Sequence, residues 1–161
     1  MTRTAPLDRF DRALLDLIQR DNQTPARLLG ERVGLSESAV LRRLRRLRQD
    51  GFVAADVAVL RPAAVGLPLT VHVLVTLERE GAAALDAFTR RIRARREVRR
   101  CWYVTGEADF ILILQLPGME AYDAFTRTVF HDDPNVKSYR SFITMREVVG
   151  DADAPPLLPP D

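Results

Sequence analysis

Apolar residues recur at helical spacing in three successive segments of the first fifty positions, which predicts three helices there. The first helix begins after Asp8 and ends at Asp21. The second is predicted to begin with Thr24 as its N-cap and Pro25 at the first helical position, and to end at Gly34. The apolar positions are Phe10, Leu14, Leu17 and Ile18 in the first helix, Leu28, Leu29 and Val33 in the second, and Val40, Leu44 and Leu47 in the third.

The third helix combines this apolar seam with a basic opposite face. Ser36 is its predicted N-cap, and Gly51 takes the C-terminal capping position. A shorter helix and a tight turn precede it, which is the helix-turn-helix plan whose second helix enters the major groove. Arginine offers a planar fork that matches guanine edges and phosphates, although most basic runs are simply solvated faces. The predicted DNA-contacting residues are Ser36, Ser38, Arg42, Arg43, Arg45 and Arg46, with Arg42 and Arg45 facing the groove and Arg43 supporting a phosphate contact.

The rest of the chain changes to strands alternating with helices. Residues 52–60 are rich in Val and Ala, which is typical of a strand or small hairpin, and residues 61–68 are predicted to be a linker. From residue 69 onward the predicted order is βαββαβ, the ferredoxin-like arrangement. The predicted strands cover residues 70–77, 98–105, 109–116 and 136–149, and the predicted helices cover residues 81–96 and 118–130.

The expected fold is therefore α+β in two domains. A winged helix-turn-helix domain over residues 1–60 precedes a ferredoxin-like domain over residues 69–149, and a Pro-rich tail occupies residues 150–161. A four-stranded sheet with both helices on one side leaves its other face without cover. We expect this face to pair two copies of the chain through Val71, Val73, Ile111 and Ile113 or their alternating neighbours.

Charge is unevenly distributed along the chain. Residues 1–50 carry 11 arginines against 7 acidic residues, whereas residues 51–161 carry 13 basic and 15 acidic residues, so the first fifty residues are expected to meet a polyanion. One cysteine and two histidines exclude an internal disulfide and are too few for most metal sites, so neither metal nor cofactor is expected. No apolar run approaches the roughly 18 residues of a membrane helix. The first ten residues lack the apolar core of a secretory signal peptide. Both observations favour a cytoplasmic protein without membrane partners.

Two motifs resemble those of the leucine-responsive/asparagine-operon (Lrp/AsnC) regulators. The run from Leu35 to Leu44, with Leu47 and Gly51 after it, resembles the helix-turn-helix of that family. The segment from Val104 to Phe110 resembles its C-terminal signature, a Gly-x-x-Asp turn between two strands. The resemblance extends from about Leu7, with the usual acidic opening, to Val149. Gly30 stands where the family often has alanine, and it is expected to loosen the second helix by up to about 1 kcal/mol.

The resemblance implies a transcription regulator whose C-terminal domain forms homodimers, or higher oligomers, and binds a small effector, commonly an amino acid. From the residues alone, Gly106 exposes backbone donors at a tight turn and Asp109 can accept from an ammonium group. The alternative is that Gly106 shapes a hairpin, Asp109 caps it and Met119 fills the core. The residues that the resemblance assigns to the effector are Thr105, Gly106, Glu107, Ala108, Asp109, Met119, Phe142, Ile143 and Thr144.

Two other functions remain open from the sequence. Sirohaem decarboxylases resemble this family in fold, so an enzyme on the same scaffold is one alternative, although the arginine-faced third helix argues against it. A ligand-binding module that has lost DNA contact is another.

The dense basic run from Arg90 to Arg100 is expected to face water for the most part, with a secondary DNA-wrapping surface in a multimer as the alternative.

Overall fold

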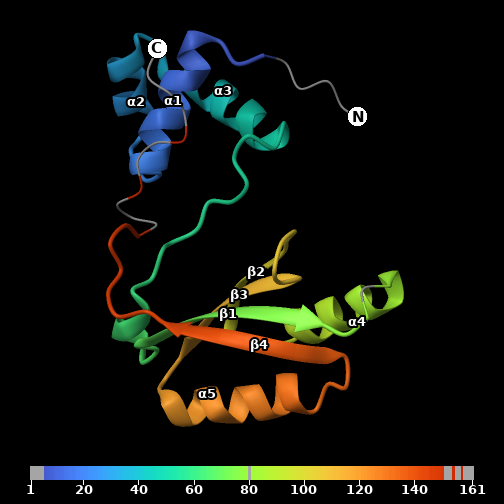
Figure 1. The fold of residues 1–161 in the computed structure, drawn as a ribbon. Coiled ribbons are helices and arrows are strands. Elements are labelled where there is room, and N and C mark those ends of the chain that lie inside the picture. The colour runs from blue at the N-terminus through green and yellow to red at the C-terminus, as the bar shows by residue number, and fades with distance from the viewer. Residues whose placement is uncertain (1–5, 80, 151–153, 155–156, 158–161) are drawn as a thin grey trace. The chain divides into compact units, whose positions relative to one another are not determined.

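The computed structural model of the protein describes residues 6–79, 81–150, 154 and 157. These residues form two compact units, an N-terminal unit that ends at Val59 and a C-terminal unit from Leu60 to Val148 (Figure 1). The predicted Pro-rich tail lies almost entirely outside the described residues. Within the described part of the chain, each helix is too short or too polar to cross a lipid bilayer.

Three helices make up the N-terminal unit, and their caps follow from the sequence. The helices are α1 (Arg9–Arg20), α2 (Ala26–Val33) and α3 (Glu37–Gln49). At the start of α1, Asp8 and Asp11 each accept a hydrogen bond from the backbone amide of the other, which is a capping box. The Ser36 hydroxyl accepts from the Ala39 amide, and Gly51 follows the end of α3 with φ of 78°, both as predicted.

The second helix begins later than predicted. Its N-cap is Pro25, and no side chain caps its first turn, so the assignment of Thr24 as N-cap is wrong. The Thr24 hydroxyl donates instead to the carboxylate of Asp21, because Asp21 places an acceptor in the turn between α1 and α2. Gly34 ends α2 in the left-handed region, with φ of 75°, as predicted.

The apolar faces of the three helices meet in one small core. Its buried members are Leu14, Ile18, Leu29, Val40, Leu44 and Leu47. The predicted seam of α3, at Val40, Leu44 and Leu47, is therefore the face that packs against the other two helices. The opposite face of α3 is left to solvent or to a partner.

Residues 52–60 contain no strand, so the predicted strand or hairpin is wrong. They form an extended coil (Figure 1), which is held near its middle by the carboxylate of Asp56. Arg48 donates to Asp56 from Nε at 2.7 Å, and Asn22 donates to it from Nδ2 at 2.9 Å. The segment has no glycine or proline turn and no second strand beside it, so its Val and Ala content cannot produce a sheet.

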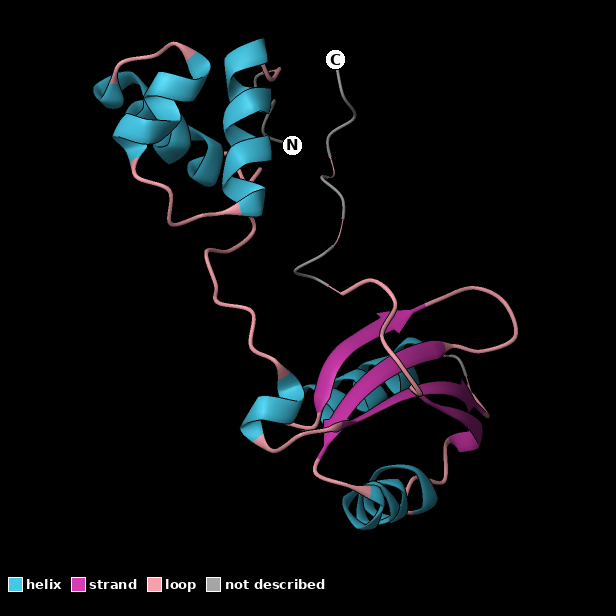
Figure 2. Cartoon of the chain, turned by 90° about the vertical axis from the view of Figure 1, so that its left-hand side faces the viewer, coloured by secondary structure: helices cyan, strands magenta, loops and turns pink. Residues whose placement is uncertain are grey.

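The C-terminal unit is a four-stranded antiparallel sheet with two helices, the predicted ferredoxin-like arrangement (Figure 2). The strands lie in the order β2-β3-β1-β4. The elements are β1 (Leu69–Leu77), α4 (Ala82–Arg93), β2 (Val98–Tyr103), β3 (Phe110–Leu116), α5 (Met119–Thr126) and β4 (Val136–Ile143). A short 3-10 turn, Pro62–Val65, precedes the sheet, and a π-helical turn, Arg127–His131, continues α5.

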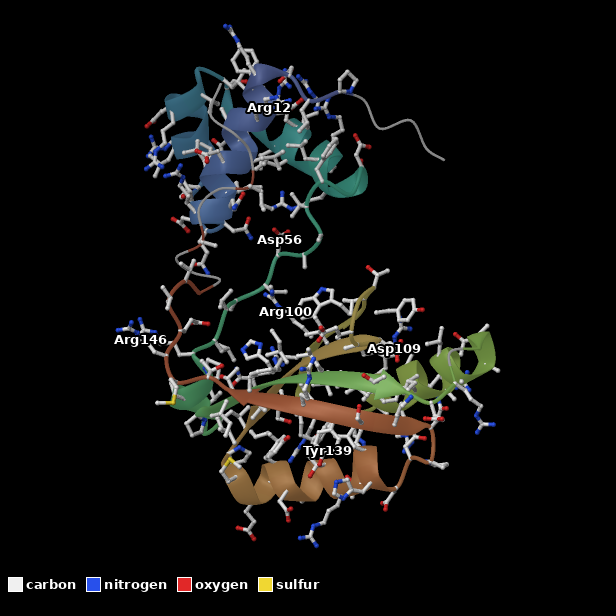
Figure 3. The ribbon with its side chains drawn as sticks, viewed as in Figure 1. Arg12, Asp56, Arg100, Asp109, Tyr139 and Arg146 are labelled. Atoms are coloured by element: carbon white, nitrogen blue, oxygen red, sulfur yellow. The ribbon has the colours of Figure 1, made fainter. Side chains whose placement is uncertain are left out.

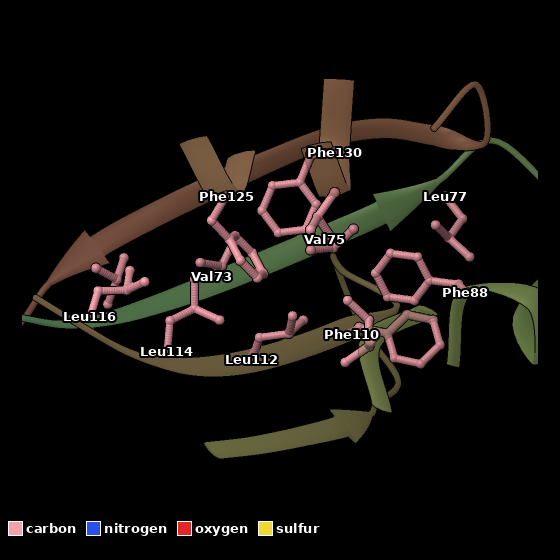
Figure 4. Packing of buried hydrophobic residues seen from close by; sticks show 13 residues of the cluster. Val73, Val75, Leu77, Phe88, Phe110, Leu112, Leu114, Leu116, Phe125 and Phe130 are labelled. Atoms are coloured by element: carbon pink, nitrogen blue, oxygen red, sulfur yellow. The ribbon is translucent and has the colours of Figure 1, made fainter. Parts of the chain in front are cut away.

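Every second residue of the central strands faces the helices. On β1 and β3 these residues are Val71, Val73, Val75, Leu77, Phe110, Leu112, Leu114 and Leu116. They pack against Phe88 of α4 and against Phe125 of α5, as Figure 4 shows. Because both helices cover this one face, the described residues leave the opposite face of the sheet open.

The open face is apolar at its centre. Its larger members are His72, Leu74, Ile111, Ile113, Trp102 and Phe142, which the strand register places beside one another. Trp102 is 43% exposed and Phe142 is 54% exposed. Val71 and Val73 are buried against the helices, contrary to the prediction that they belong to this surface, so their alternating neighbours form it together with the two isoleucines.

Candidate functional site

The outward face of α3 carries two arginines without carboxylate partners. Arg42 and Arg45 are exposed, and among the described residues neither forms an ion pair or a side-chain hydrogen bond. Ser38 lies one turn before Arg42 on the same face, with its hydroxyl 3.2 Å from that of Ser36. This face therefore presents two free guanidinium forks and a hydroxyl, which are the groups that read base edges and bind phosphates.

Arg43 and Arg46 take a different position, against the start of α1. Arg43 Nη1 lies 2.8 Å from Asp11 and 2.7 Å from Asp8, and Arg46 also pairs with Asp11. The side chain of Asp11 is 1% exposed, whereas those of Arg43 and Arg46 are 23% and 41% exposed. The DNA contacts predicted for these two arginines stay predictions; in the free chain Asp11 pairs with both guanidinium groups.

This ion-pair cluster, comprising Asp8, Asp11, Arg43 and Arg46, is the main feature that the sequence does not predict. The spacing of Asp8 and Asp11 is that of a capping box, but it does not indicate that these aspartates pair with arginines of α3. The backbone amide of Asp11 and the guanidinium of Arg43 hold the pKa of Asp8 below its usual value of 3.8. The stabilisation from Asp8 is thus present above about pH 4 and is lost as the pH falls through its lower folded-state value.

The turn between α2 and α3 depends on the absence of a side chain at Gly30. A Cβ at this position would lie 2.4 Å from the carbonyl oxygen of Leu35. The carbonyl of Gly30 also accepts from the amides of Gly34 and Leu35, at 2.8 and 2.9 Å. The expectation that Gly30 merely loosens α2 is therefore incomplete, because this glycine lets the turn pack against the helix.

Asp109, labelled in Figure 3, ends the Gly-x-x-Asp turn and makes one side-chain hydrogen bond. Its Oδ2 accepts from the amide of Leu77 at 2.7 Å, which ties the start of β3 to the end of β1. The other carboxylate oxygen has no hydrogen-bond partner among the described residues. Gly106 has φ of 126°, in the region that only glycine adopts readily. The side chain of Asp109 therefore links β3 to β1 rather than capping the β2–β3 hairpin, and among the described residues its second oxygen is left for an effector contact.

A shallow pocket of about 220 Å³ adjoins this turn on the open face of the sheet. Glu107 and Ala108 line it from the turn, together with Leu74, Thr76 and Arg140 from the strands. Glu107 also pairs with Arg140 at 2.9 Å, with both side chains largely exposed. The volume lies below the roughly 300–1,000 Å³ of ordinary small-molecule sites, so this pocket alone does not enclose a ligand.

The other predicted effector residues lie at the far end of the sheet. Phe142 and Ile143 pair with His72 and Val71, and Thr144 bonds to the ring of His72 at 3.0 Å. Met119 begins α5 at the same end and is 52% exposed, so it does not fill the core. Thr76, which contacts Glu107, is four residues along β1 from His72, or about 13 Å. One copy of the chain therefore does not bring the nine residues together.

Among the described residues, no three His, Cys, Asp or Glu side chains are placed to hold a metal ion.

Comparison with known families matches both units. The family model for the Lrp/AsnC ligand binding domain matches residues 70–153, and the model for a winged helix-turn-helix DNA-binding domain matches residues 7–54. An uncharacterised HTH-type transcriptional regulator of Sinorhizobium fredii is 46% identical over 88% of this chain and 84% of its own. The leucine-responsive regulatory protein of Escherichia coli is 33% identical over 88% of this chain and 87% of its own.

Solved structures agree with these matches. A transcriptional regulator from Neisseria meningitidis, crystallised as a complex with L-Met, superposes with a TM-score of 0.86 at 30% identity, over 93% of this chain and 97% of its own. AsnC of Escherichia coli superposes with a TM-score of 0.82 over 91% of this chain and 97% of its own. Its identity is 16%, so that likeness speaks for the fold alone.

Proposed function

This chain belongs to the Lrp/AsnC family of DNA-binding transcription regulators, and on that premise we propose that α3 reads DNA while the C-terminal unit pairs two copies and senses an amino acid. The observation that carries the DNA part is the pair of arginines, Arg42 and Arg45, that have no partner among the described residues and lie on the exposed face of a capped helix-turn-helix. The relatives named above are transcription regulators, and we propose that this chain is likewise a regulator rather than an enzyme.

Substitution of Arg42 tests the base contact. Arg42→Ala is expected to weaken operator binding by about 1–3 kcal/mol and to relax the preference at one base position, because a bidentate contact to a guanine edge is lost. The measurement is a binding titration against an operator recovered from genome-wide binding, together with variants of it at single positions. An Arg42→Ala protein with unchanged affinity and unchanged preference would contradict the assignment.

Arg43 provides the matched comparison on the same helix. If it supports a phosphate contact, Arg43→Ala weakens binding to all sequences alike and lowers the slope of log affinity against log salt by about one. Its stability must be measured in parallel, since Arg43 also pairs with Asp8 and Asp11. The two variants thus separate sequence reading from backbone contact.

For the effector, we propose that the free oxygen of Asp109 accepts from the ammonium group of an amino acid. The L-Met complex of the Neisseria relative supports the class of ligand. An amino acid is shorter than the separation between the Gly106–Asp109 turn and the Phe142–Thr144 edge. A ligand that meets both groups must therefore lie where a second copy of the chain brings its own edge to this turn.

Two substitutions of Asp109 separate the ligand contact from the structural one. Asp109→Asn keeps an acceptor for the amide of Leu77 but removes the charge, whereas Asp109→Ala removes both. Both variants are expected to lose effector binding in calorimetry, and only Asp109→Ala should also lose thermal stability. With wild-type protein, the effector is expected to change operator affinity by about 5- to 150-fold. Normal effector binding by Asp109→Asn would leave Asp109 with its structural role alone.

Pairing is proposed to use the open face of the sheet. Light scattering of the full chain at micromolar concentration is expected to report at least a dimer, because the described part of one chain leaves this apolar face uncovered. Ile111→Glu, at the centre of the face, should shift the protein toward monomer. Arg90→Glu, on the exposed side of α4, serves as the control and should not. A dimer that survives Ile111→Glu unchanged would place the interface elsewhere.

A further inference from the structure

A second and larger pocket lies on the helix side of β2, away from the predicted effector residues. It has a volume of about 490 Å³ and lies between the C-terminal end of α4 and the edge strand β2. Unlike the shallow pocket beside Glu107, it falls within the size range of small-molecule sites. The lining side chains that matter here are Arg93, Arg95, Arg99, Cys101, Tyr103 and Phe110.

Positive charge is concentrated around this pocket. Residues 90–100 contain seven of the 13 basic residues in the second part of the chain, which is acidic overall. Arg91 is neutralised by Asp133. By contrast, Arg93, Arg95 and Arg99 have no ion pair among the described residues. Clustered positive charges repel one another and attract an anion, so the electrostatic potential of the pocket favours a negatively charged ligand.

The wall beside these arginines is aromatic and apolar. Tyr103 is 59% exposed, and its ring packs on that of Phe110 with 5.3 Å between their centroids. Ile92 and Val98 complete the apolar lining. A flat ring can therefore stack on Tyr103 while its charged substituent reaches the guanidinium groups, which bind phosphate oxygens in a bidentate manner.

We propose that this pocket binds a nucleoside phosphate, with the base against Tyr103 and the phosphates held by Arg93, Arg95 and Arg99. This site is separate from the amino acid site, since it lies on the opposite face of the sheet. Both sites adjoin the loop over residues 104–109, because Tyr103 and Phe110 flank that loop and Glu107 belongs to it. The chain would thus receive a second small-molecule signal.

The lone cysteine provides a built-in reporter. Cys101 is a free thiol that lines the pocket, and partial desolvation raises its pKa, so labelling is best done at mildly alkaline pH. With the full chain and no DNA present, ATP without Mg²⁺ is expected to slow thiol labelling in a saturable manner. Pyrophosphate should protect more weakly, and adenosine should protect least.

Variants distinguish a built pocket from diffuse charge. Arg93→Gln with Arg95→Gln is expected to weaken ATP protection by about tenfold or more. The matched control, Arg90→Gln with Arg96→Gln, removes the same charge from the same run but outside the pocket, and it should leave protection unchanged. Tyr103→Leu should weaken protection by ATP but not by pyrophosphate. Thermal melting checks that each variant is folded.

Three results would overturn the proposal. The first is an absence of saturable protection by ATP or pyrophosphate in the wild-type protein. The second is an equal loss in the Arg90 and Arg96 control, which would mean nonspecific attraction. The third is protection by a DNA duplex but not by nucleotides, which would make the pocket a DNA phosphate contact. Arg42→Ala should leave all these labelling rates unchanged, so failure here is distinct from failure of DNA reading by α3.

Discussion

Replacement of Asp11 with alanine is expected to lower the free energy of unfolding of the N-terminal unit by about 3 kcal/mol. Asp11 accepts hydrogen bonds from Arg43, from Arg46 and from the amide of Asp8, and its side chain is 1% exposed. Removal of one partner from a buried ion pair costs about 3–5 kcal/mol, because the remaining charge loses its compensation. The lower end applies here, since both guanidinium groups retain access to water.

Hydrogen exchange of peptides from α1 and α3 measures this change separately from the C-terminal unit. Asp16→Ala is the matched control, because Asp16 lies on the same helix and pairs with Arg20 at its surface. That exposed pair, four residues apart, is expected to contribute at most about 0.5 kcal/mol. Equal effects of the two substitutions would show that the cluster of Asp8, Asp11, Arg43 and Arg46 contributes no more to the free energy of unfolding than an exposed ion pair.

Gly30→Ala is expected to destabilise the N-terminal unit by about 2–4 kcal/mol, although alanine is the better helix former by about 1 kcal/mol. The added Cβ would approach the backbone oxygen of Leu35 to 2.4 Å, and a backbone atom cannot move aside as a flexible side chain would. Overpacking of this kind costs about 1–3 kcal/mol. Displacement of the turn also weakens the hydrogen bonds from Gly34 and Leu35, which contribute about 0.5–1.5 kcal/mol each.

The same exchange measurement applies to Gly30→Ala, together with DNA binding, since the turn sets the position of α3. Arg32→Ala is the control on α2, because Arg32 is exposed and its replacement changes helix propensity without adding bulk. A Gly30→Ala protein as stable as the wild type would mean that the turn relaxes without loss. In that case Gly30 would affect α2 only through its low helix propensity.

Local chemistry explains which parts of the fold were predictable from the sequence. Ser36 and Gly51 mark the two ends of α3, and both could be predicted because each caps the helix through residues close to it in the chain. Val40, Leu44 and Leu47 lie in the core because helical periodicity selects one face of α3. Such signals lie within about four residues of the position they determine.

Most of the features that the sequence did not predict depend on residues far apart in the chain; the cap of α2 is the exception, since Thr24 bonds to Asp21 only three positions away. Asp11 and Arg43 are 32 positions apart, and nothing near either one indicates the other. The coil over residues 52–60 has strand-like composition but no strand to pair with. The Gly106–Asp109 turn and the Phe142–Thr144 edge were grouped by family resemblance, and only the strand register shows that they lie at opposite ends of β1.

Because these two groups of residues lie at opposite ends of β1, the response to the effector is expected to depend on the concentration of the protein itself. If an effector contacts both ends, it is retained only where two copies meet, so its apparent affinity rises with protein concentration by mass action. A cell with little of this protein would then be insensitive to an amino acid at a level that it detects when the protein is plentiful. The regulator would then respond to the product of two quantities, the concentration of the effector and its own copy number.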